Sequence, residues 1–473
     1  MCEGFDPLDS ALLALQAAAD GGCAEQGLRR LRQQRLAGLL RACQARSPLY
    51  RRWLQGVDPS RARLQDLPVA RRSVLMEHFD EWVADPRLRL RELRDFVADP
   101  LRIAEPYAGR YLVWHSSGTS GEPGMFVQDA HAMAVYDALE CVRGPWARLA
   151  PELAASCNLQ RKLVLVGATE EHFASTVAAA RLRRLNPWLA TQLRSLSLLQ
   201  PPAELRRAIE RLQPVVLATF PSVALQLAEE RAAGRLDVAL REVWVGGETL
   251  SPATRRFIER SFGCPVRNSY GASEFLSIAS PCVHGAMHLN ADWVILEPLD
   301  EHGRAADAGS EGSSVLLTNL ANHVQPLLRY QMSDRISLSP QRCACGSALP
   351  VITVQGRDDD VLHLPARGGG VLAVSPLAIT TIVEERAGLL DYQVVQTAAD
   401  RLVLGCRGRD TSTRRRLARA VRQLQSWLDS LGVADVRVRG DAELAIELAA
   451  GGKVPRVLAL RAARRVGATA AGA

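Results

Sequence analysis

The stretch that decides the fold is residues 214–247, PVVLATFPSVALQLAEERAAGRLDVALREVWVGG. Its two ends, 214–220 and 241–247, are short apolar runs of the kind that form buried strands. The segment between them, 221–234, has the periodicity of an amphipathic helix. A strand, a helix and a second strand in this order predict two parallel strands joined by a crossover helix.

The same pattern continues outward and predicts an α/β fold. KLVLVGA at 162–168 is a further strand-like run in a region where such runs alternate with helical stretches. Residues 1–100 are rich in Leu, Ala and Arg at helical spacing, which predicts a helical N-terminal region of the large domain. We expect the α/β core of that domain over residues 101–357. Beyond it, the order helix, strand, strand, helix, strand predicts a small α+β domain over residues 358–473.

Composition places the chain among globular proteins. Its 473 residues are 47% hydrophobic and 23% charged, which excludes disordered and fibrous classes and allows two or three domains. No apolar run reaches the roughly 18 residues of a membrane span, and the first ten residues lack the order of a signal peptide. We therefore expect a cytoplasmic protein with no membrane partner, whose cysteines are free or metal-bound.

Arginine occupies almost every basic position of this chain. There are 58 Lys+Arg residues against 51 Asp+Glu, a net charge of +7, yet the only lysines are Lys162 and Lys453. Residues 410–473 hold 12 basic and 6 acidic residues, so most of the net charge lies in the expected small domain. Such a segment is either a solvated helix face or a surface for a polyanion. A polybasic tail would mix Lys with Arg, so nucleic acid is not an expected partner.

A loop rich in Ser, Thr and Gly lies within residues 115–129, HSSGTSGEPGMFVQD, between two strand-like runs. Glycines let backbone N–H groups turn toward an anion and hydroxyl groups add donors, so this composition favours a phosphate cradle. The loop lacks the GK[ST] ending of a Walker motif, which argues against an ordinary P-loop nucleotidase. A flexible linker is the alternative, although linkers rarely join two strands of one domain.

Four further motifs follow in order: VGGETL at 245–250, NSYGASEF at 268–275, LLRYQMSDRI at 327–336 and QGRDDDVL at 355–362. The first three end apolar runs with small or polar residues, as expected at strand ends around a ligand. The Glu274 carboxylate is suited to a Mg²⁺ ion that bridges phosphates, and Asp334 to two ribose hydroxyls. Taken singly, an acid in either position is more often a capping or surface residue.

Taken in order, SSGTSGEPG, GGE, NSYGASE, RYQMSD and GRDDD resemble the adenylate-forming superfamily, most closely its phenylacetate–coenzyme A ligase-like branch. The resemblance runs from about residue 45 to 460. It implies that a carboxylate attacks the α-phosphate of ATP, giving an acyl-adenylate and pyrophosphate, and that a thiol, usually of coenzyme A, then displaces AMP. It also implies a hinge near Asp358 or Asp359 about which the small domain rotates. ATP, Mg²⁺ and coenzyme A are thus expected.

The resemblance also assigns roles to single residues. It implies that ATP and AMP are bound by Ser116, Ser117, Gly118, Thr119, Ser120, Gly121, Gly247, Glu248, Asn268, Ser269, Tyr270, Gly271, Asp334 and Arg357. Two positions depart from the family pattern, because Glu122 stands where Lys is frequent and Ser333 stands where Gly is usual. Loss of a cation beside a triphosphate is expected to weaken ATP binding unless an arginine from elsewhere compensates.

Lys453, in GGKVPRV, matches the family's C-terminal lysine. The resemblance implies that it reaches the carboxylate and the α-phosphate during adenylation, so Lys453 and Glu274 are the expected catalytic residues. A compact and mobile ammonium stabilises charge on the reacting phosphorus differently from a planar guanidinium. Among 58 basic residues, an isolated lysine here favours a catalytic over a passive surface role. Lys162 opens a strand-like run and is expected at a strand edge.

Two close pairs of soft metal ligands lie far apart in the sequence. Cys282 and His284 occur in SPCVHGAMH, and Cys343 and Cys345 occur in QRCACGSALP. Two such pairs separated by a long loop suit a tetrahedral Zn²⁺ ion, and four protein ligands predict a structural site. His288 is an alternative ligand, and two unrelated thiol pairs are the alternative to a metal site.

The expected substrate is an aryl or arylalkyl carboxylic acid. Its candidate pocket residues are His172, Phe173, Gly246 and Tyr270, although a packed His–Phe pair explains the first two equally well. A carrier-protein phosphopantetheine or an amine is the alternative acceptor to coenzyme A. The sequence does not determine the oligomeric state, and the resemblance admits a homodimer because members of this branch are often dimers. A zinc-stabilised nucleic-acid-binding protein is a distant alternative, which the aromatic content of 5% disfavours.

Overall fold

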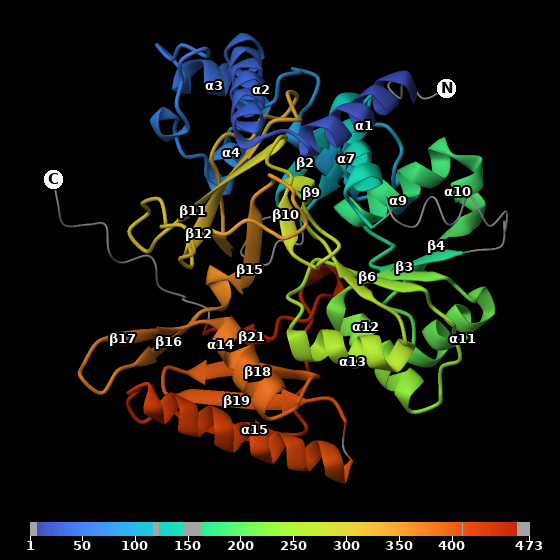
Figure 1. Cartoon of the computed structure of the whole chain (residues 1–473), viewed down its shortest axis with the longest axis vertical. Helices are drawn as coiled ribbons and strands as arrows, with labels where there is room; N and C mark the ends of the chain where they lie inside the picture. Colours follow the sequence, from blue (N-terminus) through green and yellow to red (C-terminus); the bar gives the residue numbers. More distant parts are fainter. Residues whose placement is uncertain (1–6, 117–122, 146, 148–161, 409, 461–473) are drawn as a thin grey trace. The chain divides into compact units, whose positions relative to one another are not determined.

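The computed structural model describes residues 7–116, 123–145, 147, 162–408 and 410–460 (Figure 1). The chain divides into two compact units, each of which is described by itself. The large unit comprises Met1–Leu250, Ile258–Gln355 and Ala449–Lys453, and the small unit comprises Ser251–Phe257, Gly356–Leu448 and Val454–Ala473. Within the described ranges, no helix combines the length and the apolar character needed to traverse a bilayer.

The large unit begins with a helical region. Its elements are α1 (Pro7–Gly21), α2 (Glu25–Arg46), α3 (Pro48–Trp53), η1 (Leu64–Asp66), α4 (Arg72–Glu77), α5 (Phe79–Trp82), α6 (Leu90–Val97) and η2 (Pro100–Arg102). In α2 the buried side chains recur at helical spacing, as Leu36, Leu39, Leu40 and Cys43 show. These side chains share one apolar core with residues as distant as Ile352. The helical region is therefore built into the main core of the large unit.

The stretch at 214–247 forms a strand, a helix and a strand, as predicted. β5 (Val216–Thr219) and β6 (Glu242–Val245) are parallel neighbours, and α12 (Pro221–Ala232) connects them. They lie in an all-parallel sheet of order β4-β3-β5-β6-β7, whose other strands are β3 (Leu163–Gly167), β4 (Leu193–Ser197) and β7 (Val266–Asn268).

Helices cover both faces of this parallel sheet. Figure 1 shows α11 and α12 on one face and α9 on the other. The helices other than α12 are α9 (Ala174–Leu185), α10 (Pro187–Gln192), α11 (Pro202–Leu212) and α13 (Pro252–Phe262). Parallel strands with crossover helices on both faces confirm the predicted α/β class.

Antiparallel strands complete the large unit. β1 (Leu112–His115) and β2 (Met125–Gln128) form a hairpin that leads into α7 (Ala130–Val142). A five-stranded sheet has the order β14-β15-β10-β9-β8 and a three-stranded sheet the order β11-β12-β13. Their strands are β8 (Tyr270–Ala272), β9 (Phe275–Pro281), β10 (Met287–Leu289), β11 (Val294–Leu299), β12 (Ser314–Asn319), β13 (Tyr330–Met332), β14 (Asp334–Leu338) and β15 (Val351–Arg357).

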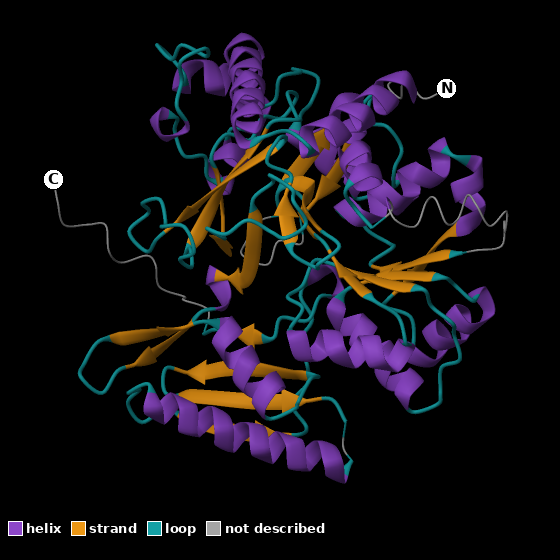
Figure 2. Ribbon diagram, in the orientation of Figure 1, coloured by secondary structure: helices purple, strands orange, loops and turns teal. Residues whose placement is uncertain are grey.

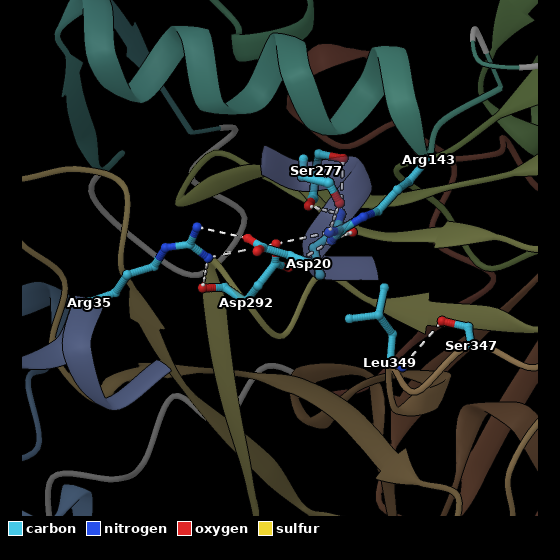
Figure 3. Close-up of polar contacts among 9 residues, drawn as sticks. Asp20, Arg35, Arg143, Ser277, Asp292, Ser347 and Leu349 are labelled. Carbon is cyan, nitrogen blue, oxygen red and sulfur yellow. Dashed lines mark hydrogen bonds and ion pairs between the residues drawn. The ribbon is translucent and has the colours of Figure 1, made fainter. Parts of the chain in front are cut away.

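A buried network of four charges ties α1 and α2 to the end of α7 and to the turn between β10 and β11 (Figure 3). Asp292 is fully buried and accepts hydrogen bonds from both terminal nitrogens of Arg143, at 2.7 and 2.9 Å. Arg35 pairs with Asp20 at 2.9 Å and lies 3.7 Å from Asp292. The guanidinium carbon of Arg35 also lies 3.5 Å from the ring centroid of Trp293. Two arginines thus balance two aspartates away from water, which makes each of them costly to remove.

The small unit is an α+β domain. Its elements are η3 (Asp358–Asp360), β16 (Leu362–Pro365), β17 (Val371–Val374), α14 (Pro376–Thr380), η4 (Thr381–Arg386), β18 (Tyr392–Ala398), β19 (Arg401–Cys406), α15 (Thr411–Ser430), β20 (Arg437–Asp441) and β21 (Val457–Leu458). The sheet order is β20-β19-β18-β21, and the long helix α15 packs on β19 and β20 (Figure 2). Asp410 caps α15, because its carboxylate accepts from the backbone N–H groups of Ser412 and Thr413.

A buried carboxylate organises another part of the small unit. Glu384, in η4, accepts hydrogen bonds from the hydroxyls of Ser251 and Thr254, the latter at 2.6 Å. Burial raises the pKa of Glu384, while Arg456 and the two hydroxyls lower it. Neighbouring Glu385 pairs with Arg256. The start of α13 is therefore held within the small unit by the hydrogen bonds to Glu384 and by one ion pair.

Candidate active site

The base of the Ser/Thr/Gly loop is closed by Ser116 and Gly124. The Ser116 backbone N–H donates to the Gly124 carbonyl at 2.9 Å, and the Gly124 N–H donates to the Ser116 hydroxyl oxygen at 2.9 Å. These bonds continue the β1–β2 hairpin to the ends of the loop. The predicted phosphate-binding residues Ser117, Gly118, Thr119, Ser120 and Gly121 lie outside the described residues, so their roles stay predictions.

The motif after β6 lies at the carboxyl end of the parallel sheet. Gly247 has φ +77°, and a Cβ atom there would lie 3.1 Å from the Phe220 ring and 3.3 Å from Cε of Lys453. A side chain at this position would therefore displace both neighbours. Gly246 approaches the Ser269 carbonyl, which would lie 3.0 Å from a Cβ atom. Both positions therefore favour glycine, Gly247 for its positive φ and Gly246 for its close approach to a backbone carbonyl.

Glu248 has a structural partner that the sequence did not reveal. Its carboxylate accepts from the backbone N–H and from the hydroxyl of Ser222, each at 2.9 Å. Ser222 lies in the first turn of α12, where a negative charge is favoured by the helix dipole. The predicted adenine-lining residue therefore also fixes the start of the helix beside the site.

The segment from β7 to β9 forms another wall of the candidate site. Asn268 ends β7, and the Ser269 N–H donates to the Val245 carbonyl at 3.0 Å, which extends the pairing with β6. Tyr270 and Gly271 lie in β8. A Cβ atom at Gly271 would lie 1.9 Å from the Leu276 carbonyl oxygen, so only glycine fits there. The four predicted residues, Asn268 to Gly271, therefore lie between the end of β7 and the middle of β8.

The environment of Glu274 has opposing effects on its ionisation. Burial raises the pKa of Glu274, and the charge of Asp334 adds to this shift. A hydrogen bond from Tyr330 and the charge of Arg72 act in the opposite direction. The backbone on either side is fixed, since Trp114 donates to the Ser273 carbonyl and Asn319 donates to the Glu274 carbonyl. Hydrogen bonds thus fix the backbone of the predicted Mg²⁺ ligand Glu274. The nearby charge of Arg72 favours the ionised form of its carboxyl group.

Lys453 lies next to the motif after β6. The segment Ala449–Lys453 groups with the large unit and contains the short helix η5 (Ala450–Gly452). The ammonium nitrogen of Lys453 lies 5.6 Å from the Phe220 ring centroid. At Gly452 a Cβ atom would lie 2.3 Å from a Leu198 methyl group, so the segment packs tightly at this glycine. Residues about 200 positions apart in the chain are thereby brought together.

His172 and Phe173 contact different neighbours. The Phe173 ring would contact a Cβ atom at Gly451, at 3.4 Å, so it adjoins the segment that carries Lys453. His172 is fully buried, and its ring lies 5.8 Å from that of Phe96. Burial lowers the pKa of His172. These contacts favour a packing role for His172 and a position beside the active site for Phe173.

Arg357 lies in the small unit, whereas Asp334 lies in the large unit. A terminal nitrogen of Arg357 lies 3.1 Å from the carboxylate of Asp359. The predicted hinge residues Asp358 and Asp359 form the start of η3, directly after β15. A shared ribose contact of Arg357 and Asp334 stays a prediction.

The candidate metal site contains His288 in place of the predicted His284. The ligand atoms of Cys282, His288, Cys343 and Cys345 all lie within 4.8 Å of one another. His284 is exposed in the turn between β9 and β10 and is not part of this group. His288 is buried in β10, the strand that pairs with β15 beside the loop of Cys343 and Cys345. The pairing of β10 with β15 therefore places His288, and not His284, beside the three cysteines.

The distances in this group suit a tetrahedral ion. Sγ of Cys282 lies 3.7 Å from Sγ of Cys343, and Sγ of Cys345 lies 3.3 Å from Nε2 of His288. Zn–S bonds of about 2.3 Å give a tetrahedron edge of about 3.8 Å. Nδ1 of His288 donates to the Leu349 carbonyl at 2.8 Å, which leaves Nε2 as the ligand atom. A hydrogen bond from the Cys345 backbone is the first cause that lowers the pKa of Cys343, to about 6.

Two residues near the site were missed by the sequence argument. Phe220 directly follows β5, so the rule that ligands gather at the carboxyl ends of parallel strands would have found it. Arg72 is the first residue of α4, far from every motif, and no local signal marks it. Only the packing of the helical region against the β1–β2 hairpin reveals its position.

The fold and the site together define an adenylate-forming enzyme. Residues 13–313 match the family of AMP-binding enzymes, which is more than half of the chain. The chain therefore belongs to this family.

Individual relatives support the same branch. A phenylacetate–coenzyme A ligase of Thermus thermophilus is 26% identical over 384 residues, which are 77% of this chain and 80% of that protein. The corresponding ligase of Escherichia coli is 29% identical over 162 residues, 33% of this chain and 37% of the relative. These similarities confirm the resemblance to the phenylacetate–coenzyme A ligase-like branch.

A solved structure confirms the fold. The crystal structure of a 2-hydroxyisobutyryl-CoA ligase in complex with an acyl-adenylate matches with a TM-score of 0.69 at 19% identity. The match covers 93% of this chain and 91% of that structure. The described residues thus have the fold of an α/β enzyme with a small α+β domain.

Proposed function

We propose that this enzyme activates an aryl or arylalkyl carboxylic acid with ATP and transfers the acyl group to coenzyme A. The main support for this proposal is the position of Lys453 beside Gly247. The reaction of this family needs an ammonium group at that motif. The phenylacetate ligases among the relatives support the acid class. The Phe173 and Phe220 rings near the Lys453 segment supply apolar surface suited to an aromatic acid.

The proposed first step breaks the bond between the α-phosphorus and the bridging oxygen of ATP. A carboxylate oxygen of the acid attacks the α-phosphorus, and pyrophosphate leaves with the electron pair of that bond. Lys453 stabilises the negative charge on the attacking and phosphoryl oxygens. Glu274 would hold a Mg²⁺ ion, which would neutralise charge on the phosphates. In the second step a thiolate attacks the acyl carbon and AMP leaves.

The test of the first step is acid-dependent exchange between ATP and labelled pyrophosphate. A panel of phenylacetate, benzoate, 2-hydroxyisobutyrate and acetate separates arylalkyl, aryl and aliphatic classes. We expect the fastest exchange with an aromatic acid. No exchange with any acid, although MgATP binds, would reject adenylation. Fastest exchange with an aliphatic acid would keep adenylation and reject the proposed acid class.

Lysine substitutions test the catalytic assignment. Lys453→Ala is expected to slow the exchange by at least about 100-fold, since a single charge-stabilising group is worth that much or more. Lys162→Ala is the matched control, because Lys162 directly precedes β3 and has no role in the proposed reaction. Equal rates for the two variants would exclude Lys453 from the chemistry.

The acceptor is tested by product analysis. Coenzyme A, a phosphopantetheinylated carrier protein and an amine are offered separately to enzyme that has been loaded with acid and ATP. We expect the coenzyme A thioester. A product only with the carrier protein or the amine would select the alternative acceptor. Cytoplasmic location and a homodimer accompany this function as expectations.

We also propose that Cys282, His288, Cys343 and Cys345 bind a structural Zn²⁺ ion. Three thiol sulfurs and an imidazole are the ligands that zinc prefers, and their mutual distances fit a tetrahedron. His288→Ala is expected to abolish the zinc content measured by plasma mass spectrometry, and His284→Ala is the matched control that retains it. Zinc loss in the control with retention in His288→Ala would reverse the assignment.

A further inference from the structure

Three thiols of the proposed zinc site lie close together and are accessible from solvent. Cys282, Cys343 and Cys345 are each half-buried, and their sulfur atoms lie within 4.8 Å of one another. Their chain neighbours are open, since Val283 is 68% exposed and Ala344 is also exposed. Three other described cysteines are buried, which makes a thiol inert: Cys43, Cys264 and Cys406. Oxidants therefore reach the thiols of this group far more readily than these buried ones.

Two of the three thiols are placed to form a cross-link. The sulfur atoms of Cys282 and Cys343 lie 3.7 Å apart, although 61 positions separate the two residues in the chain. Reaching a disulfide bond length of about 2.0 Å requires these sulfurs to approach by about 1.7 Å. Cys282 directly follows β9, and Cys343 lies in the connection between β14 and β15, so neither is held inside a strand. Sγ of Cys345 instead lies 3.3 Å from Nε2 of His288.

The thiols and two predicted active-site acids lie at opposite ends of the same strands. β9 begins directly after Glu274 and ends directly before Cys282. β14 begins at Asp334, and the connection that follows it carries Cys343 and Cys345. Both strands belong to the sheet of order β14-β15-β10-β9-β8. Rigid elements of this kind carry coupling between distant sites when a neighbouring group has two discrete arrangements, here zinc-bound and disulfide-bonded.

We propose that Cys282 and Cys343 are a peroxide-sensitive thiol pair, whose oxidation to a disulfide releases the zinc ion and slows adenylation. The inference rests on the proposed zinc site and the proposed adenylation function, and it adds their regulation. The cross-link removes two of the four zinc ligands, which leaves Cys345 and His288 unable to complete a tetrahedral site. The ends of β9 and β14 that the ion held together are then joined in a different arrangement.

The oxidation consumes hydrogen peroxide and balances in two steps. The Cys343 thiolate attacks one oxygen of the peroxide, the O–O bond breaks and hydroxide leaves, which gives a sulfenic acid. The Cys282 thiolate then attacks the sulfenic sulfur, so the S–S bond forms, the S–O bond breaks and a second hydroxide leaves. Both hydroxides take protons from solvent and become water. The two sulfurs together supply the electron pair that reduces the peroxide.

The experiment adds hydrogen peroxide to the zinc-loaded enzyme and follows three quantities. Zinc release is measured with a chromogenic chelator, the disulfide is mapped by mass spectrometry of unreduced peptides, and catalysis is measured as ATP–pyrophosphate exchange. We expect zinc release to equal the amount of Cys282–Cys343 cross-link. The exchange rate should fall by about 2- to 30-fold, which corresponds to the coupling energies measured between distant sites. A dithiol reductant with added zinc should restore the zinc content and the rate.

Substitutions separate this thiol pair from other cysteines. Cys282→Ser should form no cross-link, and peroxide should no longer lower its exchange rate. Cys141→Ser is the matched control, because Cys141 is an exposed thiol on α7 outside the group, and it should respond to peroxide like the wild type. If Cys282→Ser does not fold, the peptide map of the wild-type enzyme decides whether the cross-link forms.

Several results would overturn the inference. Zinc that stays bound in peroxide, or zinc release without the Cys282–Cys343 cross-link, would exclude the thiol pair and leave the proposed zinc site intact. A cross-link that leaves the exchange rate unchanged, or a loss of rate that the reductant does not reverse, would exclude the regulation. Untreated enzyme without zinc would reject the proposed zinc site and the inference with it. Absence of exchange with every acid would reject the proposed function, while zinc release and the cross-link still decide the thiol pair.

Discussion

The buried charge network predicts that Asp292→Ala destabilises the large unit severely. Asp292 is fully buried and accepts two short hydrogen bonds from Arg143, at 2.7 and 2.9 Å. Its removal leaves the guanidiniums of Arg143 and Arg35 in the core with Asp20 as the remaining acid of the network. Breaking one partner of a buried charge group costs about 3–5 kcal/mol. That is a large share of a total stability of about 5–15 kcal/mol.

Urea unfolding followed by tryptophan fluorescence measures this loss. Trp293, which stacks against Arg35, is one of the eight tryptophans that contribute to this emission. With a slope near 3 kcal/mol per molar urea, the midpoint should fall by about 1 M or more. Asp66→Ala is the control, because Asp66 forms an exposed ion pair with Arg63 and should leave the midpoint unchanged.

The outcome that refutes this reasoning is specific. A midpoint for Asp292→Ala within the error of the Asp66→Ala midpoint would show that water or a rearrangement compensates the buried arginines. Asp292→Asn should fall between the two, because it keeps the shape and one acceptor but loses the charge. If Asp292→Asn equals the wild type, hydrogen bonding rather than charge explains the network.

Two further predictions concern a glycine and a buried acid. Gly271→Ala should abolish pyrophosphate exchange and lower the melting temperature, because a Cβ atom would lie 1.9 Å from the Leu276 carbonyl oxygen. Gly167→Ala is the control and should change neither, because nothing lies within 4 Å of a Cβ atom there. Equal behaviour of the two variants would contradict the clash at Gly271. Glu384→Gln should stabilise the small unit only at higher pH. The folded pKa of Glu384 is raised by burial, so wild-type stability falls as pH rises from the unfolded value through the folded one. Unfolding in urea between pH 4 and pH 8 should show a growing advantage for Gln, and a pH-independent difference would contradict this.

Some of the active site was accessible from sequence because its motifs follow strands. Gly246, Gly247 and Glu248 follow β6, and Asn268 ends β7, so the carboxyl-end rule places them at one edge of the sheet. The partner of the Glu248 carboxylate was not accessible, since Ser222 belongs to a helix that precedes β6 by many residues. Contacts between side chains of different elements depend on tertiary packing, which the periodicity of the sequence does not predict.

The candidate zinc ligands are a second case in which the sequence did not predict which side chains meet. Sequence spacing pairs Cys282 with His284, whereas the folded chain pairs the cysteines with His288. In the antiparallel pairing of β9 with β10, Met287 lies opposite Pro281 and His288 opposite Ser280. His284 falls in the turn between these strands and points into solvent as an exposed residue. A difference of four positions is decided by the register of a hairpin, which short-range composition does not specify.

The sequence by itself determined the α/β class, the order of the motifs and the family, because these depend on local periodicity and on residue types at fixed spacing. Tertiary structure alone decided that Arg72 approaches Gly124, that Lys453 lies beside Gly247 and Phe220, and that His288 joins the cysteines. These contacts join segments that are distant in the chain. Their formation depends on how apolar faces pack into shared cores, and packing is a property of the whole folded unit.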